Sequence, residues 1–386
     1  MRLCIVGGAL QGMEAAYLAL NAGYETVIVD RRADAPASSL GDHFIQMDPV
    51  KDRSKALQVI GDCDAVLPAN ENIELLSVLR SLACEAEVPL LFDMDAYRVS
   101  SSKIASNDLM GRLSVPMPIQ WPTCGFPAVV KPSSQSGSIG VSVVRNEGEM
   151  NRGLEEVKRL KDVPVVQEYV HGRNFSVEVI GNGMSAVSYF LTEVILDENY
   201  DCKMVRCNPG KDRGVCLQLG SYAVKIAESM SLNGIMDIEA IEGESGIRIL
   251  EVDARIPSQT PAAIYHATGV NLLKELVNSR SKSMTVPRFH SGSSIYEHVY
   301  VDSGIMRTCG EKMFSNVREP YILDGLFGAD RVITDFSPSK EIWYATLIFT
   351  GRDEAEAENK RKNSISLMMD ECSIRKYCDP SPGVRV

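Results

Sequence analysis

The sequence predicts an α/β protein in which a Rossmann-like parallel sheet precedes a larger antiparallel sheet. Two patterns support this fold class. Residues 3–12 lead from an apolar strand through a glycine-rich turn into a helix, and residues 26–30 form the next apolar strand, which is the layout of a βαβ unit. Residues 236–241 and 251–255 alternate charged and apolar side chains on either side of a short loop, which is typical of an antiparallel hairpin.

The parallel layer is expected to span residues 1–92. After the strand that ends at Asp30, residues 65–68 give a third strand, and residues 88–92 close the layer. Ligands of parallel sheets bind at the carboxyl ends of the strands. Asp30 and Glu71 both follow such ends, so we expect their carboxylates to meet at a substrate-binding edge.

The same layer raises an alternative function, that of a nicotinamide-dependent oxidoreductase. Asp30 lies at the distance from the glycine turn that suits an acid binding a ribose hydroxyl. However, Ala9 replaces the middle glycine of the dinucleotide fingerprint, and its side chain hinders the approach of a pyrophosphate. The oxidoreductase is therefore kept as a second hypothesis.

The middle of the chain carries a strand that ends in a lysine and continues into a loop of small residues. Residues 126–131 are apolar up to Lys131, and residues 133–141 are rich in serine and glycine. Small residues let backbone N–H groups approach phosphate oxygens, and the lysine adds a fixed positive charge. No Gly-Lys-Ser/Thr follows, so this is not a Walker loop. A further strand near residues 163–170 runs into a short polar connection.

The hairpin places carboxylates on one face of its two strands, together with Arg255. Residues i and i+2 of a strand share a face, and hard oxygen ligands suit Mg²⁺, which usually takes one or two protein carboxylates plus substrate phosphates. A solvated sheet face explains either strand alone, but the loop upstream favours a nucleotide–metal site. Helices are expected over residues 95–113, which include Lys103, and over residues 221–231, and a second hairpin over residues 192–205.

This order of parts resembles the ATP-grasp superfamily over residues 103–260. The resemblance implies an ATP-grasp fold with a Rossmann-like domain (1–92), an ATP-grasp region (93–290) with a mobile α+β lid at about 116–183, and a C-terminal unit (291–386) that completes the antiparallel catalytic sheet. It also implies an ATP-dependent ligase that forms an amide bond with release of ADP and phosphate.

The resemblance implies roles for individual residues. Lys131 and Arg255 would act on the transferred phosphoryl group, and Mg²⁺ would be bound by Glu239, Glu251 and Asp253. Two metal ions, or Mn²⁺ in place of Mg²⁺, are compatible with these ligands. The nucleotide-binding residues would be Lys103, Lys131, Ser136, Gly137, Ser138, Ile139, Gly140, Val141, Gln167, Glu168, Tyr169 and Val170.

Two positions depart from the superfamily pattern. Asp253 stands where Asn is common, which adds negative charge to a site that still suits Mg²⁺. Asn174 stands where a ribose-binding Glu is often found, so the ribose contact is left open.

Across its full length the chain resembles a narrower family, the ligases that join 3-methylornithine to lysine in pyrrolysine biosynthesis. The residues that carry this resemblance are 7–17, 65–72, 91–98, 200–205, 234–241, 251–261 and 295–298. It implies that the carboxylate of 3-methyl-D-ornithine is activated by ATP and attacked by the ε-amine of L-lysine. Leu10, Gln11 and Glu71 would lie near the lysine, and the ornithine near Arg255, Ser258, Gln259, Thr260 and Glu297, with Asp30 and Asp237 as further substrate-binding residues.

Three alternatives stay open: another ATP-grasp amino-acid ligase, the oxidoreductase, and a non-catalytic nucleotide-binding regulator. The last is disfavoured because the metal carboxylates and Arg255 are all present.

Composition agrees with a small-molecule enzyme. The formal net charge of -11 argues against a nucleic-acid partner and is compatible with cationic substrates. The 10 cysteines include no Cys-x-x-Cys and suggest reduced thiols in the cytoplasm. Neither a membrane span nor a signal peptide is expected, and a homodimer is compatible with the sequence.

Overall fold

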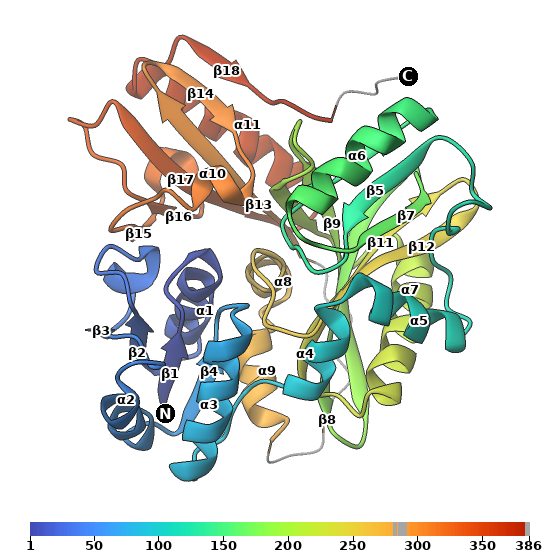
Figure 1. Cartoon of the computed structure of the whole chain (residues 1–386). Coiled ribbons are helices and arrows are strands. Elements are labelled where there is room, and N and C mark those ends of the chain that lie inside the picture. Colours follow the sequence, from blue (N-terminus) through green and yellow to red (C-terminus); the bar gives the residue numbers. More distant parts are fainter. Residues whose placement is uncertain (281–283, 285–291, 383–386) are drawn as a thin grey trace.

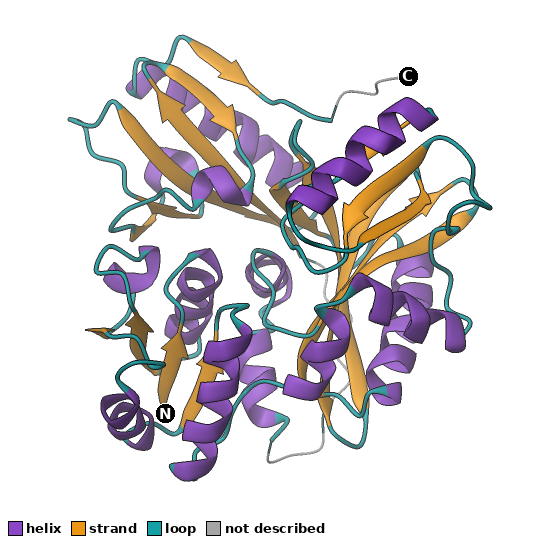
Figure 2. Cartoon of the chain, in the orientation of Figure 1, coloured by secondary structure: helices purple, strands orange, loops and turns teal. Residues whose placement is uncertain are grey.

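The computed structural model describes residues 1–280, 284 and 292–382 of the chain. The described strands form three sheets, with helices packed against their faces (Figure 2). The predicted boundary between residues 290 and 291 lies outside the described residues. Within the described ranges, no helix combines the length and the apolar character that crossing a membrane requires.

The N-terminal layer is a parallel sheet in the strand order β3-β2-β1-β4, as the βαβ pattern predicts. Its strands are β1 (Arg2–Val6), β2 (Glu25–Asp30), β3 (His43–Gln46) and β4 (Ala65–Pro68). Apolar side chains of β1 and β2 are buried on both faces, which is typical of a parallel sheet between helices. The covering elements are α1 (Leu10–Asn21), the turn η1 (Pro36–Ser39), α2 (Arg53–Gly61) and α3 (Ile73–Glu85).

The strand expected at residues 88–92 is reduced to a single parallel bridge between Leu90 and Val66. Pro89 interrupts the segment and has no N–H to donate to a ladder. The expected helix at 95–113 is two helices, α4 (Met94–Ser100) and α5 (Lys103–Arg112). They separate at Ser102, whose hydroxyl caps α5 by accepting from the N–H of Ala105.

A small antiparallel sheet in the order β6-β5-β7 lies at the predicted lid. Its elements are β5 (Ala128–Pro132), β6 (Ser142–Val144), α6 (Glu147–Arg159) and β7 (Pro164–Glu168). Helix α6 lies along this sheet (Figure 1). Val157 of α6 and Val130 of β5 belong to one buried apolar cluster. Residues 172–182, which were expected in the lid, form β8 of the large sheet instead.

The large sheet runs in the order β12-β11-β8-β9-β10-β13-β17-β16-β15, with β14 and β18 beside β13. Its strands are β8 (Gly172–Asn182), β9 (Ala186–Leu196), β10 (Cys202–Cys207), β11 (Asn233–Gly243), β12 (Gly246–Asp253), β13 (Ser293–Asp302), β14 (Ile305–Thr308), β15 (Tyr321–Asp324), β16 (Arg331–Thr334), β17 (Ile342–Gly351) and β18 (Lys376–Cys378). Both predicted hairpins, β9–β10 and β11–β12, are present. The predicted domain boundaries themselves stay predictions.

Helices divide the large sheet into two faces. Helix α7 (Arg213–Ser229), which begins eight residues before the predicted 221, packs on the apolar face with Val177 and Ile238. Helix α8 (Thr260–Thr268) covers the opposite face and lies near the centre of the molecule, beside the N-terminal layer (Figure 1). The remaining helical elements are α9 (Leu272–Asn278), α10 (Glu311–Phe314), η2 (Leu326–Gly328) and α11 (Glu354–Glu371).

Candidate functional site

The β11–β12 hairpin places four of its carboxylates side by side on one face. Asp237 lies opposite Asp253, and Glu239 lies opposite Glu251. Arg255 follows β12 and joins this group to the N-terminal layer. Its Nη2 lies 2.8 Å from Oδ2 of Asp253, and its Nε lies 2.9 Å from Oε1 of Glu71. The carboxyl edge of the parallel sheet and the carboxylate hairpin therefore meet at Arg255.

Both predicted lysines are buried and point at the same hairpin. Nζ of Lys103 forms a 2.7 Å ion pair with Oε1 of Glu251 and donates to the carbonyl of Gln135 at the same distance. Nζ of Lys131 donates a long 3.4 Å hydrogen bond to the carbonyl of Leu250. Burial lowers the pKa of Lys131 to about 8, because Glu251 offsets only part of the desolvation. An anion placed between these lysines would raise the pKa of Lys131 back toward its ordinary value.

The charge of the hairpin carboxylates is only partly compensated, because Glu251 and Asp253 form ion pairs whereas Asp237 and Glu239 form none among the described residues. Burial, together with the neighbouring charges of Glu251 and Asp253, raises the pKa of Glu239 to about 7. Burial raises the pKa of Asp253 to about 6 even though Arg255 lowers it, and the pKa of Asp237 lies well above its ordinary value for the same reason. Glu239 is nevertheless exposed to solvent, so protein atoms surround this carboxylate and leave it open to water on one side. Such a group favours a bound cation.

The donor set fits Mg²⁺. Glu239 and Glu251 are cross-strand neighbours that offer hard oxygen atoms. Glu251 also pairs with Lys103, and Asp253, the third predicted ligand, pairs with Arg255. In the described ranges no three or more His, Cys, Asp or Glu side chains are arranged to hold a metal ion by themselves. Mg²⁺ commonly takes one or two carboxylates and completes its shell with water and phosphate oxygens, so this pair is a sufficient protein contribution.

The predicted loop at residues 136–141 reaches across the site. The hydroxyl of Ser136 donates to Oε2 of Glu71 at 2.7 Å, and that of Ser138 donates to the carbonyl of Tyr200 at 2.8 Å. Gly137, Ser138 and Gly140 all have positive φ angles, which lets the loop turn tightly. The loop thus contacts both the N-terminal layer and the β9–β10 turn.

The predicted hinge, Gln167 to Val170, continues from β7. The N–H of Glu168 donates to the carbonyl of Ile119, and the N–H of Ile119 donates to the carboxylate of Glu168 at 3.1 Å. The N–H of Tyr169 donates to Pro127. Oε1 of Gln167 is a buried acceptor without a hydrogen-bond partner among the described residues. An unpartnered acceptor beside the hinge fits a ligand that donates there, such as an amino group of a base.

The predicted substrate-binding residues of the N-terminal layer contact different parts of the protein. Leu10 is buried at the start of α1, and Nε2 of Gln11 donates to the carbonyl of Ile256 at 2.5 Å. Asp30 accepts the N–H of Gly8 at 2.7 Å, while Glu71 contacts Arg255 and Ser136. The structure therefore does not pair Asp30 with Glu71 as expected.

The glycine turn is also closed by protein groups. The N–H of Ala37 donates to the carbonyl of Gly8, and a Cβ added at Gly8 would lie 2.8 Å from that of Ala35. Asp30 and the η1 turn thus occupy the groups that a dinucleotide would use, which removes the basis for the oxidoreductase hypothesis.

The substrate candidates after Arg255 are held by acids that sequence analysis did not identify. Ser258 donates to the carboxylate of Glu311 in α10, and the N–H of Gln259 donates to Glu14 in α1. Gln259 has a φ of 61°, an uncommon conformation for a residue with a Cβ, and Thr260 begins α8. Glu14 also accepts from the hydroxyl of Tyr296.

Glu14 had a sequence signal, because it is the one acid in the apolar run of residues 9–20. Glu311 had none, because only the fold brings α10 to this site.

Glu297 is not brought to the carboxylate hairpin. Its side chain is fully buried and forms a 2.6 Å ion pair with Arg361 of α11. The neighbouring His298 faces the other way and stacks on Phe314, with ring centroids 3.9 Å apart. The strand alternation was expected correctly, but the face was assigned wrongly because α11 supplies an arginine from 64 residues away.

Glu14→Gln is expected to flatten the decline of stability with rising pH. Burial raises the pKa of Glu14 from 4.5 to about 8. The folded state therefore keeps a proton that the unfolded state releases, and stability falls as the pH rises from 4.5 to about 8. Glutamine can still accept from Gln259 and contact Tyr296.

Chemical denaturation at pH 5 and pH 8 measures this effect. The wild type should lose roughly 3–4 kcal/mol more than the variant over this interval. Equal pH slopes would show that Glu14 is ionised in the folded protein.

The lysines, carboxylate hairpin, covering loop and hinge define the class of ATP-grasp ligases. A family model described as an ATP-grasp domain matches residues 100–259. The chain is 34% identical over 373 residues to the 3-methyl-D-ornithine–L-lysine ligase of Methanosarcina acetivorans, covering 95% of this chain and 98% of that protein. The chain therefore belongs to the family of 3-methyl-D-ornithine–L-lysine ligases.

Solved structures share the fold at low sequence identity. The biotin carboxylase domain of a 2-oxoglutarate carboxylase from Hydrogenobacter thermophilus, a dimer in complex with MgADP and bicarbonate, has a TM-score of 0.72 at 16% identity and covers 95% of this chain and 89% of its own. An N5-carboxyaminoimidazole synthetase from Staphylococcus aureus, complexed with ADP, has a TM-score of 0.68 at 14% identity and covers 95% and 96%. These likenesses confirm the predicted fold.

Proposed function

We propose that this chain uses ATP to join the carboxylate of (3R)-3-methyl-D-ornithine to the ε-amine of L-lysine through an acyl phosphate. The observation that carries the proposal is the convergence of two buried lysines and Arg255 on one carboxylate hairpin. The full-length similarity to ligases of this name supports the choice of substrates.

The proposed roles of the site residues follow from their charges. Lys103 and Lys131 would hold the ATP phosphates, with the loop at 136–141 over them and the hinge at 167–170 around the adenine. Glu239, Glu251 and Asp253 would hold Mg²⁺, whose charge offsets that of the phosphates when it is bound. Arg255 would orient the carboxylate and the transferred phosphoryl group. A second metal ion, Mn²⁺ in place of Mg²⁺, and a homodimer belong to the same proposal.

The attacking amine must be neutral, although free lysine has a pKa near ~10.4. Carboxylates such as Glu71 would bind the lysine as a cation, and exclusion of water by the covering loop would favour loss of its proton next to the acyl phosphate. The leaving group is inorganic phosphate.

Mass spectrometry of the products tests this proposal. The purified chain would be incubated with ATP, Mg²⁺ and pairs of amino acids that include 3-methyl-D-ornithine and L-lysine. The expected products are ADP, phosphate and one amide of the two. An amide from a different pair would identify another ATP-grasp amino-acid ligase, and ATP consumption without an amide would contradict the proposal.

Glu71→Ala is expected to weaken lysine binding selectively. Glu71 lies on the N-terminal layer beside Arg255, and loss of its carboxylate should raise the lysine KM by roughly ten- to a hundredfold. The ATP KM should stay nearly constant, because the proposed nucleotide contacts lie in the lid and hairpin. Steady-state kinetics with one substrate varied at a time measure this difference.

Glu74→Ala, an exposed acid in the first turn of α3, is the matched control. A change confined to the ATP KM in Glu71→Ala would show that this carboxylate acts on the loop at Ser136 instead.

A further inference from the structure

We infer that Glu178, Asp237 and Thr260 form a subsite for the terminal ammonium group of the substrate whose carboxylate is activated. The inference rests on the proposed function and adds Glu178, a residue that none of the proposed roles includes.

The three residues are neighbours on the face of the large sheet that carries the hairpin carboxylates. Glu178 of β8 lies opposite Asp237 of β11, which in turn lies opposite Asp253 of β12. Cross-strand partners on one face have Cβ atoms about 5 Å apart. Thr260 begins α8, which covers this face, and its hydroxyl lies close enough to Glu178 to lower the pKa of that carboxyl.

Each residue contributes a buried oxygen that lacks a partner. The side chains of Glu178, Asp237 and Thr260 are 0%, 8% and 6% exposed. Oε2, Oδ1 and Oγ1 of these residues have no hydrogen-bond partner within the described ranges. The other Glu178 oxygen has only a 3.5 Å contact with Ser176. An ammonium group carries three N–H donors and no acceptor, so it can satisfy three such oxygens at once.

The negative charge of the cross-strand carboxylates Glu178, Asp237 and Asp253 also favours a bound cation. Like charges directly opposite each other in a sheet are destabilising. Arg255 forms its ion pairs with Asp253 and Glu71, so in the part of the chain that the structure describes no ion pair reaches Glu178 or Asp237. The N-terminus of α8 supplies only about half a positive charge.

The distance from this subsite to Arg255 indicates that its ligand is the substrate that bears the activated carboxylate. Neighbouring strands lie about 4.8 Å apart, so a point between β8 and β11 is roughly 7 Å from β12 and Arg255. A diamino acid with its carboxylate at Arg255 and its carbon chain extended across β11 would bring its terminal ammonium to this point. The amine of the second substrate must instead lie at the activated carboxylate in order to attack it.

Binding of matched ligands tests the subsite. Calorimetry on the full chain, with a non-hydrolysable ATP analogue and Mg²⁺, would compare 3-methyl-D-ornithine with the analogue in which hydrogen replaces the terminal amino group. The wild type should prefer the amine by roughly ten- to a hundredfold. Glu178→Gln should remove most of this preference by weakening only the amine-bearing ligand, and Thr260→Val should reduce it by a smaller factor.

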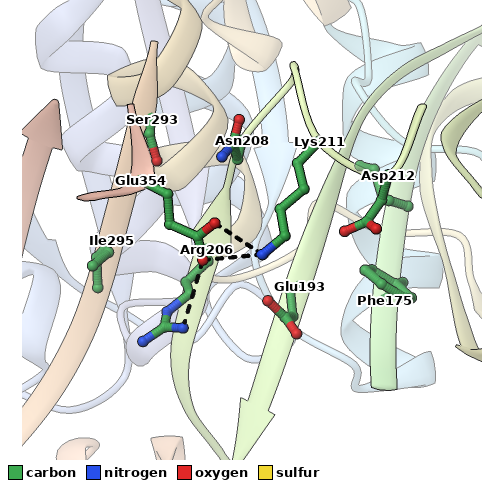
Figure 3. A pocket seen from close by; sticks show the side chains of 10 residues that line it. Phe175, Glu193, Arg206, Asn208, Lys211, Asp212, Ser293, Ile295 and Glu354 are labelled. Atoms are coloured by element: carbon green, nitrogen blue, oxygen red, sulfur yellow. Dashed lines mark hydrogen bonds and ion pairs between the residues drawn. The ribbon is translucent and has the colours of Figure 1, made fainter. Parts of the chain in front are cut away.

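Glu193→Gln is the control. Glu193 of β9 forms an ion pair with Arg173 and lines a separate charged pocket beside Arg206 and Lys211 (Figure 3). This variant should keep the full preference. An undiminished preference in Glu178→Gln, equal weakening of both ligands, or loss of Mg²⁺ binding in place of amine binding would each overturn the subsite.

Failure of the proposed function would be seen separately. If the wild type made an amide from another diamino acid, the proposed substrates would be wrong, and the same comparison with that acid and its deamino counterpart would still test Glu178. If the wild type bound no diamino acid, the subsite would be wrong as well.

Discussion

Lys131→Met is expected to abolish ATP-dependent amide formation while leaving the protein folded and more stable. The ammonium of Lys131 is buried, has one long hydrogen bond, and has a pKa lowered to about 8 by desolvation. A buried ammonium with so few partners is suited to bind an anion such as a phosphate group of ATP. Without the Lys131 ammonium, kcat/KM for ATP should fall by roughly a hundred- to a thousandfold, the usual cost of losing one preorganised charge donor.

The gain in stability follows from the same pKa. The folded pKa lies below the ordinary value of 10.5, so the wild type loses stability as the pH falls from 10.5 to about 8. Methionine fills a similar volume without charge and should stabilise the fold by about 1–3 kcal/mol at pH 7. Thermal melting at pH 7 and pH 10 would show a difference that shrinks at the higher pH.

Lys158→Met is the matched control, because Lys158 lies on the surface of α6 in the same lid. It should change neither activity nor melting temperature appreciably. A Lys131→Met protein that turned over normally at saturating ATP would show that Lys131 is a structural residue.

The parts of this site that sequence could predict are those encoded by local patterns. The alternation of Asp237, Glu239, Glu251 and Asp253 fixes a face, and the short loop between them fixes a hairpin, so their convergence needed no long-range information. The position of Lys131 at a strand end and the serine-glycine loop after it are equally local.

The parts that failed depend on contacts between distant segments. Glu297 lies in an alternating strand pattern that is compatible with a site residue, but its environment is determined by the ion pair with Arg361. The sequence around residue 297 contains no signal for that pair. Glu178 and Glu311 enter the site only because β8 joins β11 and α10 reaches Ser258. Residues 88–92 failed for a local reason. Their apolar pattern predicted a strand, but Pro89 cannot donate to a ladder, and only a single bridge forms.

Glu251→Gln is expected to lower kcat by about a thousandfold or more. Glu251 lies opposite Glu239 in the proposed metal site and forms a 2.7 Å ion pair with the buried Lys103. Glutamine keeps the shape but removes the charge that would hold Mg²⁺, and metal-ion stabilisation of a transition state is worth several kcal/mol. Activity measured across a series of Mg²⁺ concentrations should shift to higher concentrations and recover only in part.

The loss of activity in Glu251→Gln should exceed what a loss of stability alone would cause. A second acid on the hairpin provides the control that separates these two effects. Glu242 lies on the same hairpin, beyond the site, and its ion pair with Arg173 is long at 3.8 Å. Glu242→Gln should therefore leave kcat and its Mg²⁺ dependence unchanged. If Glu251→Gln matched this control in its Mg²⁺ dependence but melted at a lower temperature, the carboxylate would act only by neutralising Lys103, and the metal site would have to be built from Glu239 and Asp253 without it.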